Sequence, residues 1–191
     1  MLPPAGNRKS AMDDLWVFGY GSLMWRPGFV YEEAVPGVLH GAHRSLCIYS
    51  WVHRGTQGRP GLVLGLDRGG ACRGMAFRVA AGLREEVMAY LRAREQATLV
   101  YLEAERRVRL ADEARRMVPA VTYLVDRAHE QYAGVLPLDR QVEIVKGAAG
   151  QSGANPDYVL NTVSHLRELN IHDAGLEALS ARLGDATTEA G

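Results

Sequence analysis

The chain has 191 residues, of which 47% are hydrophobic and 23% are charged, a composition that is ordinary for a globular protein. This length suits one domain with a sizeable core, and no apolar run is long enough to predict a transmembrane helix. Basic and acidic residues number 22 each, so the formal net charge at pH 7 is zero. Composition therefore gives no reason to expect nucleic acid or an anionic membrane surface as a partner.

The two cysteines, Cys47 and Cys72, stand alone in the sequence, without Cys-x-x-Cys spacing. No cleavable apolar signal precedes the first predicted strand. This pattern favours a protein of the reducing cytoplasm, in which both thiols serve as small core residues.

Residues 1–14 contain Pro, Gly, Asn and Ser without an apolar period, and we expect a flexible tail there. Residues 16–25 then read Trp-Val-Phe-Gly-Tyr-Gly-Ser-Leu-Met-Trp. This pattern predicts a buried strand that runs into a loop of bare backbone at Gly19 and Gly21. Such a loop can aim main-chain N–H groups at an anionic group or a developing oxyanion. The alternative from the glycines alone is a tight turn without a ligand.

The next part of the chain is rich in β-branched and other apolar residues, interrupted by turn-forming residues. Residues 40–41 and 68–70 predict turns, the second of them a hairpin turn that needs positive φ. Residues 52–60 predict an irregular polar loop of the kind that often faces a site. Four strands are expected around these turns, over residues 34–39, 45–51, 61–67 and 71–79.

The remainder alternates between helical and strand patterns. Helices are expected over residues 83–96, 138–148, 155–169 and 173–183, and strands over residues 101–110 and 117–125. Residues 184–191 predict a second flexible tail. Strands first and helices later predict one α+β domain over residues 15–183, with a small curved antiparallel or mixed sheet or barrel and packed helices.

Three familiar chemistries fit the sequence poorly. A Gly-x-Gly-x-x-Gly dinucleotide loop would need a glycine at Met24, and Pro27 and Gly28 follow where a helix should begin. A Gly-x-Ser-x-Gly nucleophile at Ser22 would need glycines at Tyr20 and Met24. The six histidines show no metal-binding spacing, so no metal site is predicted.

Glu95 has an unusual position among the 22 acidic residues. It falls in the last turn of the helix predicted over residues 83–96, at the border of the apolar face. Partial burial and the negative end of the helix dipole both raise the pKa of a carboxyl group, as a general acid/base near neutrality requires. The alternatives are that Glu95 faces water, or that the neighbouring Arg94 pairs with it or marks the point where the helix frays.

The decapeptide at residues 16–25, combined with Arg94-Glu95 at a helix end, resembles the ChaC-type γ-glutamylcyclotransferases of the glutathione-specific branch. The resemblance extends from about Leu15 to Leu183 and departs from the family pattern at Leu99, where a small residue is expected. Further matching stretches are Arg44, residues 53–55, 60–63, 74–76, 131–134 and 150–153, and Tyr158.

The resemblance implies an intramolecular aminolysis without a cofactor. The α-amine of a γ-glutamyl substrate attacks its own γ-carbonyl, and glutathione gives 5-oxoproline and cysteinylglycine. Glu95 is the implied general acid/base. Residues implied in substrate binding are Val17, Phe18, Gly19, Tyr20, Gly21, Ser22, Leu23 and the phenol of Tyr132, with Arg44 and Arg54 for the glycine carboxylate.

Three other hypotheses stay open at this point. Within the same chemistry, the substrate could be another γ-glutamyl peptide or a γ-glutamylamine. A different class is a regulatory protein that binds γ-glutamyl compounds without catalysis. A serine hydrolase acting through Ser22 ranks third.

Overall fold

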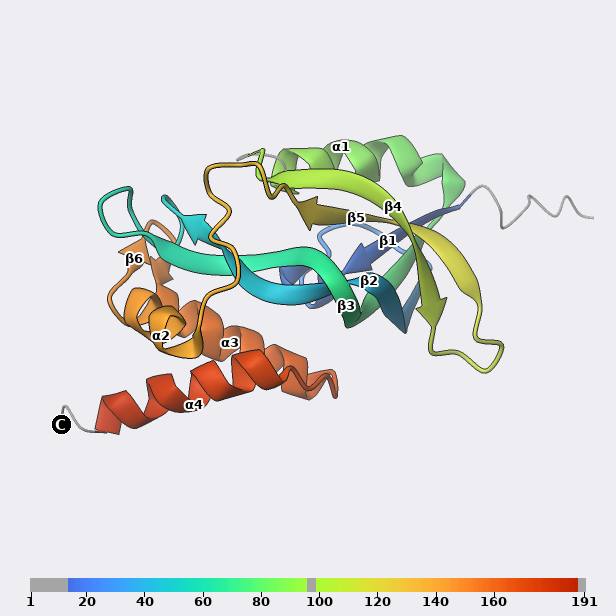
Figure 1. Cartoon of the computed structure of the whole chain (residues 1–191). Helices are drawn as coiled ribbons and strands as arrows, with labels where there is room; N and C mark the ends of the chain where they lie inside the picture. Colours follow the sequence, from blue (N-terminus) through green and yellow to red (C-terminus); the bar gives the residue numbers. More distant parts are fainter. Residues whose placement is uncertain (1–13, 96–98, 189–191) are drawn as a thin grey trace, which may run out of the picture.

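The computed structural model describes residues 14–95 and 99–188 (Figure 1). The strands are β1 (Leu15–Gly19), β2 (Glu33–Ser50), β3 (Gly61–Val79), β4 (Tyr101–Leu110), β5 (Met117–Val125), β6 (Ala149–Gly150) and β7 (Gly153–Ala154). The α-helices are α1 (Arg84–Glu95), α2 (Leu138–Lys146), α3 (Asn155–Glu168) and α4 (Ala174–Thr188), and two 3₁₀ turns are η1 (Ser22–Met24) and η2 (Ala81–Leu83).

Five strands close into a barrel in the order β1-β3-β2-β4-β5. Neighbouring strands are antiparallel except at the closure, where β1 and β5 run parallel and pair Val17 with Val121. In Figure 1, α1 lies along one side of the barrel, and α2, α3 and α4 lie together on the opposite side. The predicted α+β class with a small mixed barrel and packed helices is therefore confirmed.

Strand β1 is buried on both faces, which explains its continuous apolar sequence. Trp16 and Phe18 belong to the large core that also includes side chains of α2, α3 and α4. Leu15 and Val17 point the other way, into a second core under α1. Because cores on both sides fix this strand, the loop that follows it starts from a rigid position.

The four strands predicted between residues 34 and 79 are in fact two long ones, so that prediction was wrong. Strands β2 and β3 pair along their whole length, from Glu33 with Arg78 to Ser50 with Gly61. The expected turns at residues 40–41 and 68–70 lie opposite each other across this ribbon. The register shifts there, and Gly41, Gly69 and Gly70 have positive φ. These glycines form a β-bulge, which bends the two-stranded ribbon. They do not form a turn that reverses the chain.

The helices and the β4–β5 hairpin follow the predictions closely. Strands β4 and β5 have the predicted bounds, and α1, α2 and α3 match their predicted ranges to within three residues. Helix α4 continues to Thr188, so the C-terminal tail expected from residue 184 does not begin there. Of the N-terminal tail expected over residues 1–14, all but Asp14 lies outside the described residues.

Helix α3 begins at Asn155, as predicted, but the asparagine does not cap it. Its fully buried side chain instead accepts a hydrogen bond from the N–H of Leu62 at 2.7 Å and donates one to the carbonyl of Leu62 at 2.8 Å. The start of α3 is thereby tied to the start of β3, close to the loop that joins β2 and β3.

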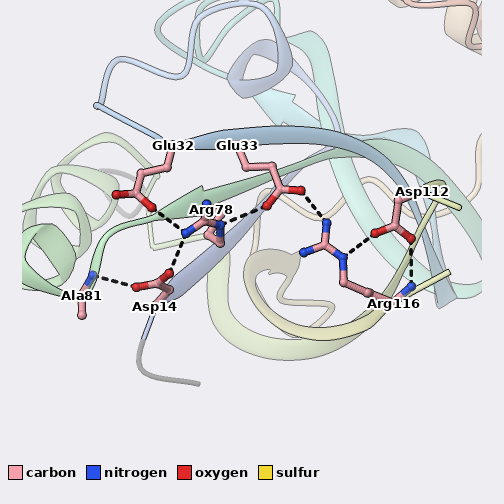
Figure 2. Close-up of polar contacts among 7 residues, drawn as sticks. All are labelled: Asp14, Glu32, Glu33, Arg78, Ala81, Asp112 and Arg116. Atoms are coloured by element: carbon pink, nitrogen blue, oxygen red, sulfur yellow. Dashed lines mark hydrogen bonds and ion pairs between the residues drawn. The ribbon is translucent and has the colours of Figure 1, made fainter. Parts of the chain in front are cut away.

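A network of ion pairs joins the strand ends at one edge of the barrel (Figure 2). The guanidinium of Arg78 contacts the carboxylates of Asp14 at 2.8 Å, Glu32 at 2.5 Å and Glu33 at 3.0 Å. Arg116 links Glu33 to Asp112 in the turn between β4 and β5. The network thus connects β1, β2, β3 and the β4–β5 turn.

Both cysteines are free thiols in the core, as their spacing predicted. No helix in the described part of the chain is long and apolar enough to cross a membrane.

Candidate active site

A small cavity of about 70 Å³ lies where the loop after β1 faces the end of α1. The loop contributes Tyr20, Gly21, Ser22 and Leu23, and the helix contributes Glu95. The remaining lining residues are Phe18, Leu64, Tyr101, Tyr123 and Tyr158. Two stretches that stand about 70 residues apart in the sequence therefore meet across one cavity.

Glu95 is the last residue of α1, and its side chain is mostly buried. Burial raises the pKa of its carboxyl group above the ordinary value, while the nearby Arg94 lowers it. Burial is the stronger of the two effects. The result is a carboxylate that can take up and release a proton closer to neutrality than an exposed glutamate.

Arg94 joins the helix end to the glycine loop. Its Nε lies 3.2 Å from Oε1 of Glu95, and Nη2 donates to the hydroxyl of Ser22 at 2.9 Å. Nη1 donates to the carbonyl of Arg26 at 2.7 Å and to the hydroxyl of Tyr90 at 2.9 Å. One guanidinium therefore holds the carboxylate and the loop in a fixed relation across the cavity. Of the two roles that the sequence left open for Arg94, pairing with Glu95 is the observed one.

Four tyrosines give the cavity phenol groups that stay protonated at neutral pH. Burial raises the pKa of Tyr158 to about 12 and places the pKa values of Tyr20 and Tyr101 well above the ordinary value. Burial, together with Glu103, also raises the pKa of Tyr123. The cavity is consequently lined with neutral hydrogen-bond donors and holds one carboxylate.

The backbone of Leu64 fixes two of these phenols. Tyr101 donates its hydroxyl proton to the carbonyl of Leu64 at 2.8 Å, whereas Tyr158 accepts the N–H of Leu64 at 3.1 Å. The proton of Tyr158 is therefore free for a ligand. The hydroxyl of Tyr20 forms no hydrogen bond within the described part of the chain, so it too can serve a ligand.

Arg44 supports the loop from behind and does not line the cavity. Its buried guanidinium donates from Nε to the carbonyl of Tyr20 at 2.6 Å and from Nη2 to the carbonyl of Arg73 at 2.7 Å. The ion pair with Asp173 at 3.3 Å neutralises the charge. Arg44 therefore fixes the carbonyl of Tyr20 from outside the cavity, and the structure does not support the predicted contact of Arg44 with a substrate carboxylate.

The other predicted site residues divide into two groups. Phe18, Tyr20, Gly21, Ser22, Leu23 and Glu95 are brought together at the cavity. The remaining ones do not line the cavity. Val17 packs in the core under α1, Gly19 at the end of β1 pairs with Met75 of β3, and Arg54 lines a neighbouring cleft. Tyr132 lies elsewhere, since its hydroxyl donates to the buried carboxylate of Asp67 at 2.8 Å and Arg127 covers its ring.

Sequence reasoning missed Leu64, Tyr101 and Tyr123, and assigned no role to Tyr158. One signal was available for two of them. In the predicted β4–β5 hairpin, Glu103 pairs with Tyr123, so Tyr101 and Tyr123 are diagonal neighbours on one face. Leu64 and Tyr158 come from β3 and α3, and only the tertiary structure brings these elements to the cavity.

No group of three or more potential ligands among His, Cys, Asp and Glu is placed to hold a metal ion within the described residues.

Solved structures with the same architecture define the fold class. Two crystal structures of a yeast γ-glutamyl cyclotransferase specific to glutathione superpose with TM-scores of 0.80 and 0.79 at 22% identity. The match covers 90% and 91% of this chain and 96% and 99% of the yeast chain. The chain thus has the γ-glutamyl cyclotransferase fold.

The family follows from the sequence comparisons. The model of the ChaC-like protein family matches residues 15–185, so the chain belongs to the ChaC-like family. A glutathione-specific γ-glutamylcyclotransferase of Escherichia coli K12 is 33% identical, with 86% of this chain and 71% of that protein covered. An enzyme of the same name from Schizosaccharomyces pombe is 32% identical, with 86% and 91% covered.

Proposed function

We propose that this protein is a γ-glutamylcyclotransferase that cleaves glutathione into 5-oxoproline and cysteinylglycine. The observation that carries the proposal is the buried Glu95 carboxylate, which faces the glycine loop across a small cavity lined with phenols. The relatives named above support glutathione as the substrate.

Glu95 moves the protons in this proposal. Its carboxylate takes a proton from the α-ammonium of the glutamyl group, and the freed amine attacks the γ-carbonyl carbon to close a five-membered ring. The tetrahedral intermediate then collapses, and Glu95 returns the proton to the cysteine nitrogen as the bond to that nitrogen breaks. The ring nitrogen passes its second proton through Glu95 to the departing amine. Over the whole reaction the α-nitrogen loses two protons and the leaving nitrogen gains two, so no oxidant or reductant is consumed.

The loop and the phenols hold the glutamyl group in its cyclising conformation. No side chain caps the N–H groups at the start of η1, so they can meet the α-carboxylate or the developing oxyanion. Tyr20 and Tyr158, which both line the cavity, can donate their hydroxyl protons to the substrate. Confining the flexible glutamyl chain in a small cavity brings the amine to the carbonyl, which favours ring closure over hydrolysis.

The proposal is tested by mass spectrometry of the products from purified protein. Glutathione should give 5-oxoproline and cysteinylglycine in equal amounts, and glutathione acetylated on the α-amine should give no product because its nucleophile is blocked. Release of glutamate, or cleavage of the acetylated compound, would show hydrolysis and refute the aminolysis. A panel of γ-glutamyl dipeptides and γ-glutamylamines, compared by kcat/KM, decides the preferred substrate.

The non-catalytic alternative predicts saturable binding of glutathione without 5-oxoproline. The presence of Glu95 weighs against this alternative. Burying most of an ionised carboxylate costs free energy, and a site that only binds its ligand does not need a proton-transfer group. A cytoplasmic location is a further proposal, which rests on the two free thiols.

A further inference from the structure

A second hollow of about 530 Å³ opens directly beside the catalytic cavity. We call it the outer cleft. Ser22 and Tyr158 line both spaces, so a ligand can extend from one into the other past these two side chains. The walls of the outer cleft come from the loop after β1, the polar loop at residues 51–60, the β6–β7 hairpin and α3.

The outer cleft is lined with basic side chains, whereas the catalytic cavity holds a carboxylate. Arg26, His53, Arg54 and His165 line it, and none of the described residues that line it is acidic. Glu168 lies at its margin, where it contacts Nδ1 of His165 at 3.3 Å. The ring of His165 is also stacked on Trp25, with 4.6 Å between centroids. The guanidinium groups therefore supply the permanent positive charge of the cleft.

Both arginines retain donors for a ligand. Within the described residues, Arg26 is in no ion pair, and its side chain is exposed at the cleft. Arg54 uses Nη1 to donate to the carbonyls of Ser152 and Ala154, and its guanidinium carbon lies 5.2 Å from the ring centroid of Tyr158. These contacts fix the plane of the guanidinium, while Nε and Nη2 form no hydrogen bond to any described residue and remain available for an anion.

We propose that the outer cleft binds the cysteinylglycine half of glutathione, with Arg26 and Arg54 holding the terminal glycine carboxylate. This inference rests on the proposed function and adds a specificity site to it. The scissile amide then lies at the shared boundary beside Ser22 and Tyr158. Trp25 and Val63 give the cleft an apolar part that suits the neutral thiol side chain.

The site predicts discrimination by the terminal charge of the substrate. Glutathione is compared with its glycinamide form, which differs only in the loss of that charge. The wild-type protein should show a KM about tenfold lower for glutathione, with kcat within twofold, because the carboxylate is remote from the reacting atoms. Equal KM values for the acid and the amide would overturn the proposal.

The variant Arg26→Met isolates the contribution of one guanidinium. We expect about a tenfold higher KM for glutathione and an unchanged KM for the glycinamide. Arg54→Lys, which keeps the charge but loses the planar donor group, should have an intermediate effect. Arg107→Met is the matched control, since it removes another exposed arginine, on β4 outside the cleft, and should behave as the wild type. Equal losses on both substrates in Arg26→Met would refute a carboxylate contact.

A binding measurement separates this proposal from the proposed function. Calorimetric titration of the Glu95→Gln variant gives the dissociation constants of glutathione and of its glycinamide without turnover. Their ratio measures the contribution of the glycine carboxylate to binding. About tenfold weaker binding of the amide, abolished by adding Arg26→Met, supports the subsite even if no 5-oxoproline is formed. Normal 5-oxoproline formation with equal affinities for the two ligands overturns the subsite and leaves the function intact.

Discussion

Gly21 offers a direct test of whether the loop after β1 is a binding element or only a turn. A Cβ atom built on Gly21 meets one neighbour within 4 Å, Cδ1 of Leu64 at 3.6 Å, which is ordinary van der Waals contact. Its φ of −135° lies outside the left-handed region that favours glycine. The variant Gly21→Ala should therefore fold with a free energy of unfolding within about 0.5 kcal/mol of the wild type.

The same methyl group should strongly impair catalysis. Gly21 and Leu64 both line the small cavity, so the added carbon takes up space that the glutamyl group needs. Overfilling a closely packed site costs about 1 to 3 kcal/mol. At about 1.4 kcal/mol for each factor of ten, kcat/KM should fall by roughly 5-fold to 150-fold.

The assay compares kcat/KM for glutathione with the thermal unfolding midpoint of the same preparation. Gly74→Ala is the opposite control, because its Cβ would lie 2.3 Å from the carbonyl oxygen of Gly19 and should destabilise the fold. Normal turnover by Gly21→Ala would show that the loop is only a turn and would refute its role in binding.

Three further predictions concern single residues outside the glycine loop. Arg94→Met removes the positive charge that lowers the pKa of Glu95, so the acidic limb of the kcat/KM profile should move to higher pH, and an unmoved limb would argue against Glu95 as the base. Arg78→Met breaks three ion pairs at the barrel edge, and should lower the free energy of unfolding by about 1 to 2 kcal/mol in urea titrations at low salt, less at high salt. Leu99→Gly should raise the unfolding midpoint slightly, since Leu99 is exposed and has a φ of 57°, and a lower midpoint would contradict this.

The sequence predicted those parts of the fold that depend on local pattern. The apolar run of β1, the helical period of α1 and the alternation in β4 and β5 each reflect a face that must be buried, so their bounds could be placed. The ribbon of β2 and β3 could not, because Gly41 and Gly69 have the same local chemistry in a bulge as in a hairpin turn. Only the pairing partner distinguishes the two.

In the site, too, local motifs could be predicted from the sequence, whereas contacts between distant segments could not. Glu95 and the glycine loop carry short, unusual motifs, and their place at one cavity was implied by the family resemblance. Arg44 was expected to contact the substrate, but its guanidinium binds the carbonyls of Tyr20 and Arg73. A strand pattern does not indicate which partner an arginine side chain will have. Tyr158 reaches the cavity because Asn155 anchors the start of α3 to Leu62, a contact between residues far apart in the sequence.

Leu99 departs from the family pattern at a position where the backbone has a positive φ. The resemblance implied a small residue at this position. The positive φ of Leu99 gives the reason, because glycine adopts this conformation without the steric cost that a side chain brings. The strain lies close to Glu95 in the sequence, four residues beyond the end of α1.

The most direct test of the central claim is turnover of glutathione by the variant Glu95→Gln. Glutamine preserves the size and position of the side chain but cannot accept the α-ammonium proton. We predict that 5-oxoproline formation falls by at least about a hundredfold, while the unfolding midpoint is unchanged or higher and glutathione still binds. Turnover at the wild-type rate by a folded Glu95→Gln protein would contradict the proposed mechanism.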